Sequence, residues 1–172
     1  MNDTVKVALG FGIAGLVGGA VSGGGTFLGL GVFGALCGIF LGLLARNRRV
    51  ATAGAALGAV SFMAGGALAF VIGMAAGFAF GAPDWYDALL PAFMGACAGV
   101  AGGFGLVAVN RGEGRTWRSA VGLALGFAVA ALTNQMWLVH VLPGYVLQAA
   151  VPLCLWGLLG GIGFSALRRS PQ

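Results

Sequence analysis

The sequence carries very little charge. Aspartate, glutamate, lysine and arginine together make up 8% of its 172 residues, whereas soluble globular domains average about 25%. Because so few charged side chains cannot cover a surface that faces water, a soluble domain is not expected.

Side chains that handle metals, protons or electrons are also scarce, since the chain has one histidine, four acidic residues and three cysteines. The cysteines, Cys37, Cys97 and Cys154, lie in apolar stretches, and an odd number leaves at least one unpaired. A single histidine cannot supply the two ligands of a bis-histidine haem. We therefore expect no disulfide framework, no metal, no cofactor and no enzymatic activity.

Apolar residues are abundant in place of charge. Hydrophobic residues make up 59% of the chain, and residues 50–82 and 119–139 contain no charged side chain. Uncharged apolar runs of about 18 residues or more are typical of transmembrane helices. The sequence predicts an all-α polytopic integral membrane protein with a single transmembrane domain over residues 1–172.

The basic residues form four short clusters between the apolar stretches, and this distribution predicts the orientation of the chain. The clusters are Lys6; Arg46, Arg48 and Arg49; Arg111, Arg115 and Arg118; and Arg168 with Arg169. Short cytoplasmic loops concentrate lysine and arginine, so we expect both termini inside, at the anionic headgroups of a plasma (inner) membrane. The short loops favour a bacterial or archaeal source, and the clustering argues against a nucleic-acid partner.

Six helices are expected, in three hairpins at about 5–45, 50–109 and 119–167. Their ranges are 5–21, 26–45, 50–82, 88–109, 119–142 and 145–167. The third segment would be roughly 50 Å long against a hydrocarbon core of about 30 Å. We therefore expect it either to tilt strongly or to break, at Gly65 and Gly66 or near Gly73 and Gly77.

Short sequence similarities predict a threefold repeat of the hairpin. Ala-Leu-Gly-Phe at 8–11 recurs at 124–127 and weakly at 56–59, and Gly-Gly-x-Gly at 102–105 recurs at 160–163. Chance similarity in a chain rich in alanine, leucine and glycine is the alternative explanation. The arrangement resembles that of the urea channels, which also repeat a two-helix hairpin three times, although no motif of that family occurs here.

The 34 glycines predict closely packed helices, because small residues let transmembrane helices approach one another. Three sets have the spacing of four that places residues on one helix face. They are Gly34, Gly38 and Gly42; Gly73, Gly77 and Gly81; and Gly95, Gly99 and Gly103. These faces pack either within one subunit or against copies and partner subunits, so a homo-oligomer or a larger complex is also considered.

Two apparent catalytic motifs lack the context that their chemistry needs. Residues 10–15 and 29–34 match the G-x-G-x-x-G pattern of dinucleotide sites, but both lie inside apolar spans without the required preceding strand. Ser22 and His140 resemble the dyad of rhomboid-type proteases, but Ala20 stands where that motif has glycine. Neither pattern predicts an active site.

A small polar group remains, formed by Thr133, Asn134, Gln135 and His140, which Gln148 and Ser61 could join. Polar side chains within a membrane either hold helices together or line a pathway for a solute. Since no charged residue accompanies them, ion-coupled transport is not expected. We predict a non-catalytic membrane subunit that packs against partner helices or lipid, and as the alternative a small channel or carrier for a neutral or apolar solute.

Overall fold

The computed structural model describes residues 2–22, 26–81, 86–110, 116–133 and 145–167. These residues form six α-helices, as predicted. The helices are α1 (Asp3–Val21), α2 (Thr26–Leu44), α3 (Arg48–Phe80), α4 (Tyr86–Val109), α5 (Trp117–Thr133) and α6 (Tyr145–Ala166). The predicted all-α class is confirmed.

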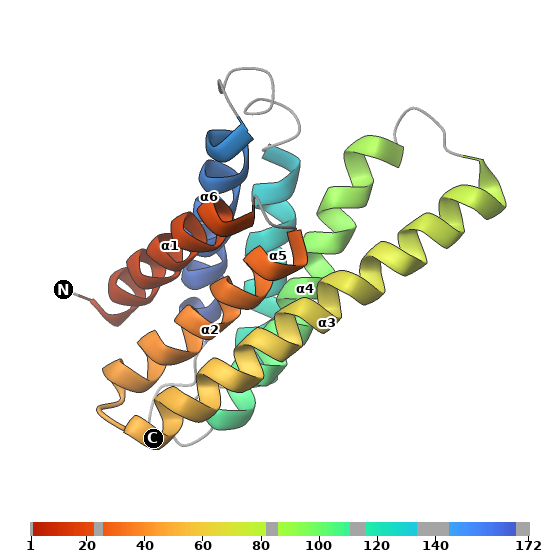
Figure 1. Ribbon diagram of the computed structural model, residues 1–172. Coiled ribbons are helices and arrows are strands. Elements are labelled where there is room, and N and C mark those ends of the chain that lie inside the picture. Colours follow the sequence, from red (N-terminus) through yellow and green to blue (C-terminus); the bar gives the residue numbers. More distant parts are fainter. Residues whose placement is uncertain (1, 23–25, 82–85, 111–115, 134–144, 168–172) are drawn as a thin grey trace.

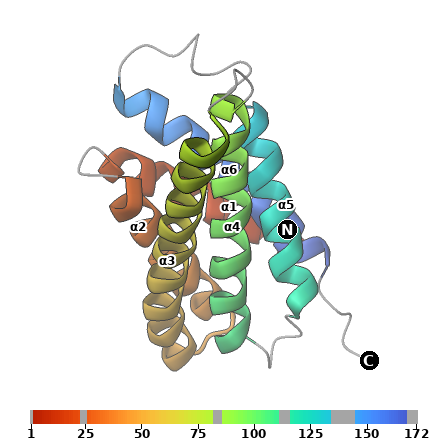
Figure 2. The ribbon, with the colours of Figure 1, turned by 90° about the vertical axis from the view of Figure 1, so that its right-hand side faces the viewer.

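The helices run antiparallel to their neighbours in sequence and pack side by side (Figures 1 and 2). α6 also returns to α1, so the bundle closes into a ring of six neighbouring pairs. The most extensive contacts join α1 to α6 and α2 to α3, whereas the α1–α2 hairpin has the least contact of the six pairs. Contacts between hairpins therefore hold the ring at least as strongly as contacts within them.

Five helices are long and apolar enough to cross a membrane, namely α1, α2, α3, α4 and α6. α5 has 17 residues among those described, which is at the lower limit of about 17 for a spanning helix. The predicted continuation of α5 to residue 142 lies outside the described residues. By helix length and composition, this is the architecture of a multi-pass membrane protein.

α3 is a single unbroken helix of 33 residues, so the predicted alternative of a break is wrong. Its buried glycines include Gly54, Gly58, Gly65 and Gly66, which lie against the neighbouring helices α2 and α4. Because lipid and packed helices offer the backbone no competing hydrogen-bond partner, glycine does not interrupt a helix here as it does in water.

The ends of α4 differ slightly from the prediction. The helix begins at Tyr86 rather than at residue 88, so Pro91 lies inside the second turn instead of the first. A proline within a helix leaves one carbonyl without its backbone donor. α6 likewise contains Pro152.

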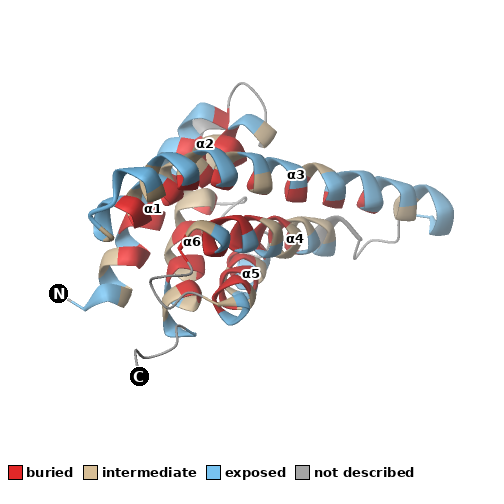
Figure 3. Cartoon of the chain, turned by 90° about the horizontal axis from the view of Figure 1, so that it is seen from below, coloured by how far each residue is buried: buried red, intermediate tan, exposed pale blue. Residues whose placement is uncertain are grey.

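The buried residues face the inside of the ring, and the outer surface is apolar and exposed (Figure 3). α3 extends past the other helices at its C-terminal end, as Figure 3 shows. α2 accompanies α3 as far as Phe70, whose ring centroid lies 5.9 Å from that of Phe27.

Candidate functional site

Five phenylalanine side chains fill the centre of the ring. Phe11, Phe33, Phe62, Phe127 and Phe164 come from five different helices and have no exposed surface. Their ring centroids lie 5.0 Å apart for Phe33 and Phe62 and between 5.5 and 6.3 Å for the other contacting pairs. These distances are typical of stabilising aromatic pairs.

The aromatic cluster closes the middle of the bundle. Trp156 extends it from α6, with its ring centroid 5.3 Å from that of Phe127, and Leu106 and Leu123 are fully buried beside it. Protein interiors packed in this way contain few voids larger than a water molecule. At the level of these rings, the described residues form a packed core.

Glycines form the contact between α2 and α3. The glycine face predicted for this part of the chain lies directly against the backbone of α3. The facing pairs are Gly34 with Gly58, Gly38 with Gly54 and Gly42 with Ala51. A β-carbon added to any of the three α2 glycines would meet α3 backbone atoms, so no side chain larger than hydrogen fits at these positions.

The same arrangement recurs at two other contacts of the ring. Gly99 and Gly103 of α4 lie against α5, where an added β-carbon would be 2.7 Å from Ala124 Cα and from Ala120 Cα respectively. Gly161 of α6 lies against α1, where an added β-carbon would be 2.8 Å from Ala8 Cα. Gly157, one turn earlier in α6, also faces α1. Each even-numbered helix thus presents a glycine face to the next odd-numbered helix around the ring.

The remaining predicted glycines are Gly95 of α4, Gly73 and Gly77 of α3, and Gly81 at the end of α3. A β-carbon at Gly95 would lie 3.3 Å from the carbonyl oxygen of Phe127. Gly73 is buried in α3 and Gly77 is half-buried. Gly81 ends α3 with φ +71°, and no described atom lies within 4 Å of its β-position.

The polar group of the α5 region lies mostly outside the described residues, which exclude Asn134, Gln135 and His140. Thr133 is exposed, and its hydroxyl donates to the carbonyl of Val129 at 2.9 Å. Gln148 is exposed on α6 and Ser61 is half-buried on α3. These three described residues belong to three different helices, α5, α6 and α3.

A groove that was not predicted from the sequence lies at the α2–α3 turn. It has a volume of about 500 Å³. Its lining residues are Ile39, Gly42, Leu43, Arg46, Asn47, Arg48, Ala51, Thr52 and Ala55. The polar members sit at the turn and the apolar members follow along both helices.

Hydrogen bonds fix the backbone of this turn. The N–H of Asn47 donates to the carbonyl of Gly42 at 2.9 Å, and the N–H of Arg46 donates to that of Leu43 at 3.1 Å. This Schellman pattern requires a left-handed residue after the helix, and that residue is Arg46, with φ +53°. The Asn47 side chain then caps α3 by accepting from the N–H of Arg49 at 3.0 Å.

Several buried hydroxyl groups make no hydrogen bond within the described structure. They are those of Thr116, Ser119 and Ser165, near the start of α5 and the end of α6. The indole N–H of Trp156 is likewise unpaired there. Asn110 is buried, but its side-chain amide donates to the carbonyl of Leu106 at 2.8 Å.

The other sequence patterns fall on packed helices. Gly10, Gly12 and Gly15 face Phe40, Leu158 and Leu153 inside the bundle, and the hydroxyl of buried Ser22 donates to the Gly18 carbonyl at 2.9 Å. The three cysteines are free thiols, and no group of three potential metal ligands occurs among the described residues. Comparison with protein-family models, with curated proteins and with solved structures gives no match to this chain.

Proposed function

We propose that this protein is a non-catalytic integral membrane subunit, which packs against partner helices or lipid within a larger membrane complex. The observation that carries the proposal is the contrast between a centre sealed by aromatic rings and an outer surface rich in large apolar side chains. A protein of this kind acts through its surface.

The C-terminal part of α3 is the surface best suited to a protein partner. From Val71 to Phe80 the helix extends roughly 15 Å beyond the part that α2 covers. Phe78 is 85% exposed and Phe80 is 88% exposed. At its full length of roughly 50 Å, α3 exceeds the hydrocarbon core unless it tilts strongly, and a partner helix beside this apolar segment would cover what acyl chains do not.

Glycine contacts between successive hairpins agree in kind, but not in register, with the proposed threefold hairpin repeat. The contacts α2–α3, α4–α5 and α6–α1 each join one hairpin to the next, and a glycine of the first helix faces an alanine of the second. The pairs are Gly42 with Ala51, Gly103 with Ala120 and Gly161 with Ala8. Gly103 and Gly161 also correspond in the sequence similarity. Gly161 faces Ala8, and the Ala-Leu-Gly-Phe similarity pairs Ala8 with Ala124. Gly103 faces Ala120, which lies one helical turn before Ala124.

The proposed location is the plasma (inner) membrane of a bacterium or archaeon, with both termini in the cytoplasm. Lys6, Arg46, Arg48, Arg49 and Arg118 all lie where α1 and α3 begin, α2 ends and α5 begins. Antiparallel packing puts these helix ends at one end of the bundle (Figure 1), in agreement with the retention of basic residues in the cytoplasm.

No observation among the described residues favours the alternative of a solute channel. Phe33 and its neighbours fill the axis, and the hydroxyl of Thr133 is bonded within its own helix. Liposomes that contain the purified chain should pass urea and glycerol no faster than empty liposomes. Faster flux would restore the channel as the better proposal.

The subunit proposal is tested on the full chain in its native membrane. A photo-crosslinking amino acid at Phe78 should join the chain to a defined partner, whereas the same probe at Leu125, which is 60% exposed on α5, should label mainly lipid. After extraction in mild detergent, native mass spectrometry should find that partner at fixed stoichiometry.

Two variants distinguish a specific interface from nonspecific hydrophobic association. Phe78→Ser should release the partner, and Leu125→Ser should retain it. A lone monomer in mild detergent, together with no protein crosslink from Phe78, would contradict the proposal.

A further inference from the structure

The groove at the α2–α3 turn is charged at one end and apolar along the rest of its length. Arg46, Asn47 and Arg48 form the end at the turn, and Leu43, Ile39 and Ala55 continue it along the two helices. Leu43 is 65% exposed and Ile39 is 38% exposed, so the groove opens onto the outer surface. A phospholipid has the same order of parts, with a charged headgroup followed by an acyl chain.

The charge of the groove has one sign. Arg46 and Arg48 belong to its lining, and no carboxylate is found among the lining residues. Asp3, which lies on another helix, forms an ion pair with Lys6 at 3.6 Å. An anionic group at the turn would therefore meet two guanidinium groups and no carboxylate of the described lining.

We propose that this groove binds one anionic phospholipid. The phosphate lies between the guanidinium groups of Arg46 and Arg48, and an acyl chain lies along Leu43, Ile39 and Ala55. Arginine suits this role because its planar fork donates two hydrogen bonds to phosphate oxygens. The inference rests on the membrane location of the chain and not on its role as a subunit.

The size and surroundings of the groove fit this occupant. Its volume of about 500 Å³ lies within the range of about 300 to 1,000 Å³ that is common for small-molecule pockets. The neighbouring side chains are small because Gly42 and Ala51 bring the two helices together. The Thr52 hydroxyl donates to the carbonyls of Arg48 and Arg49, so its polar group is occupied within α3.

The presence of arginine at position 46 supplies a second reason. A left-handed conformation is unfavourable for residues other than glycine, asparagine and aspartate, yet arginine occupies this position. Strained residues that persist in a structure cluster at ligand sites and switch regions. A phosphate-binding role for the side chain accounts for arginine where glycine would fit without strain.

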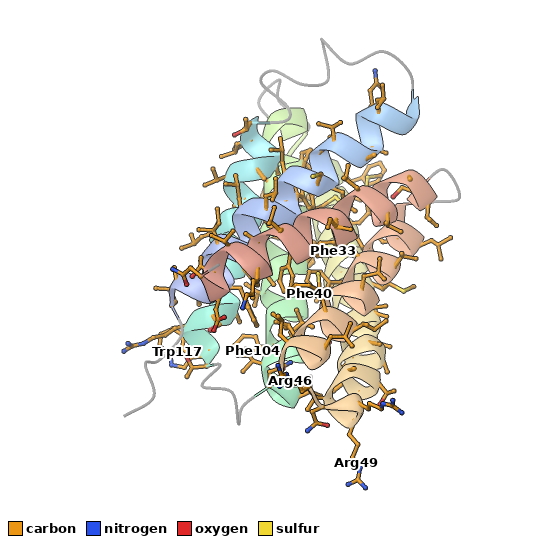
Figure 4. The ribbon with its side chains drawn as sticks, turned by 90° about the vertical axis from the view of Figure 1, so that its left-hand side faces the viewer. Phe33, Phe40, Arg46, Arg49, Phe104 and Trp117 are labelled. Carbon is orange, nitrogen blue, oxygen red and sulfur yellow. The ribbon has the colours of Figure 1, made fainter. Side chains whose placement is uncertain are left out.

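The test uses the purified full chain in a nonionic detergent and measures lipid binding by native mass spectrometry. The probes are phosphatidylglycerol, phosphatidylcholine with the same acyl chains, and inorganic phosphate. The variants are Arg46→Gly, which removes the charge and relieves the backbone, and Arg48→Gln. Arg49→Gln is the matched control, because Arg49 is outside the groove lining and points away from the bundle at the start of α3 (Figure 4).

One phosphatidylglycerol should bind per chain, and phosphatidylcholine should bind at least tenfold more weakly, about the effect of one charge-assisted contact. Arg46→Gly and Arg48→Gln should each weaken phosphatidylglycerol binding by roughly tenfold, while Arg49→Gln changes it less than twofold. Arg46→Gly should at the same time raise the unfolding midpoint, which rules out misfolding as the cause of the loss.

Three results would overturn the inference. The first is that all three variants weaken phosphatidylglycerol binding equally, which indicates general attraction to basic residues. The second is that both lipids bind equally well. The third is that inorganic phosphate displaces phosphatidylglycerol at equal concentration, which indicates that the apolar groove contributes nothing. None of these bears on the partner at Phe78, so the two proposals fail independently.

Discussion

Alanine in place of single α4 glycines measures how closely two helices of the ring approach. In Gly99→Ala and Gly103→Ala the new β-carbon would lie 2.7 Å from a Cα atom of α5. In Gly95→Ala the nearest atoms, the carbonyl oxygen of Phe127 and a ring carbon of Trp156, are 3.3 Å away. Since carbon atoms pack at about 3.5 to 4.0 Å, the first two variants must separate α4 from α5 by roughly 0.8 Å.

The expected effects follow from these distances. Forced expansion of a packed interior costs about 1 to 3 kcal/mol, so Gly99→Ala and Gly103→Ala should each lower the free energy of unfolding by that amount. Gly95→Ala needs a shift of a few tenths of an ångström and should change it by less than about 0.5 kcal/mol. The higher helix propensity of alanine is common to all three variants and cancels in the comparison.

Reversible unfolding in mixed micelles provides the measurement. Sodium dodecyl sulfate is added to the protein in a nonionic detergent, and loss of structure is followed by circular dichroism. The free energy of unfolding of Gly95→Ala should be close to that of the wild type, and those of Gly99→Ala and Gly103→Ala should be clearly lower. Equal stability of all three variants would refute the close approach of α4 and α5.

Three further predictions concern other parts of the ring. Gly38→Ala should lower the free energy of unfolding in the same assay, because its β-carbon would meet the α3 backbone at Gly54. Gly31→Ala is the control and should be tolerated, because its β-carbon would meet only the flexible side chain of Met63. Phe33→Ala should lower the free energy of unfolding by about 3 to 5 kcal/mol, and a loss below about 1 kcal/mol would contradict a packed centre. A maleimide should modify Cys37, which has no exposed surface, only on unfolding, as mass spectrometry of the labelled native chain can show.

The positions of most helices could be predicted because apolar length and turn residues are local properties. The predicted starts at Thr26 and Tyr145 agree with α2 and α6. The course of α3 could not be predicted, because glycine breaks a helix in water and tightens packing in a bundle, and the sequence does not show what faces Gly65 and Gly66. Their neighbours, Ala98 of α4 and Leu30 of α2, are defined only by the fold.

The aromatic centre and the groove were not predicted, for different reasons. The five phenylalanines belong to five helices, and no spacing in the sequence relates them. One signal was present, since Phe11 and Phe127 end the repeated Ala-Leu-Gly-Phe segment. The groove depends on the left-handed backbone of Arg46, which follows from hydrogen bonds across the turn.

The contact of α1 with α6 constrains how the chain is assembled during synthesis. α1 is made before α6, yet its contact with α6 is more extensive than its contact with α2. Gly15 and Gly19 of α1 pack against the backbone of α6, which is not yet present when α1 is made. Until residue 166 has entered the bilayer, that face of α1 has only lipid or an insertion factor beside it. Truncation before α6 should therefore leave an insertion intermediate that quality-control proteases recognise, even though the first five helices are complete.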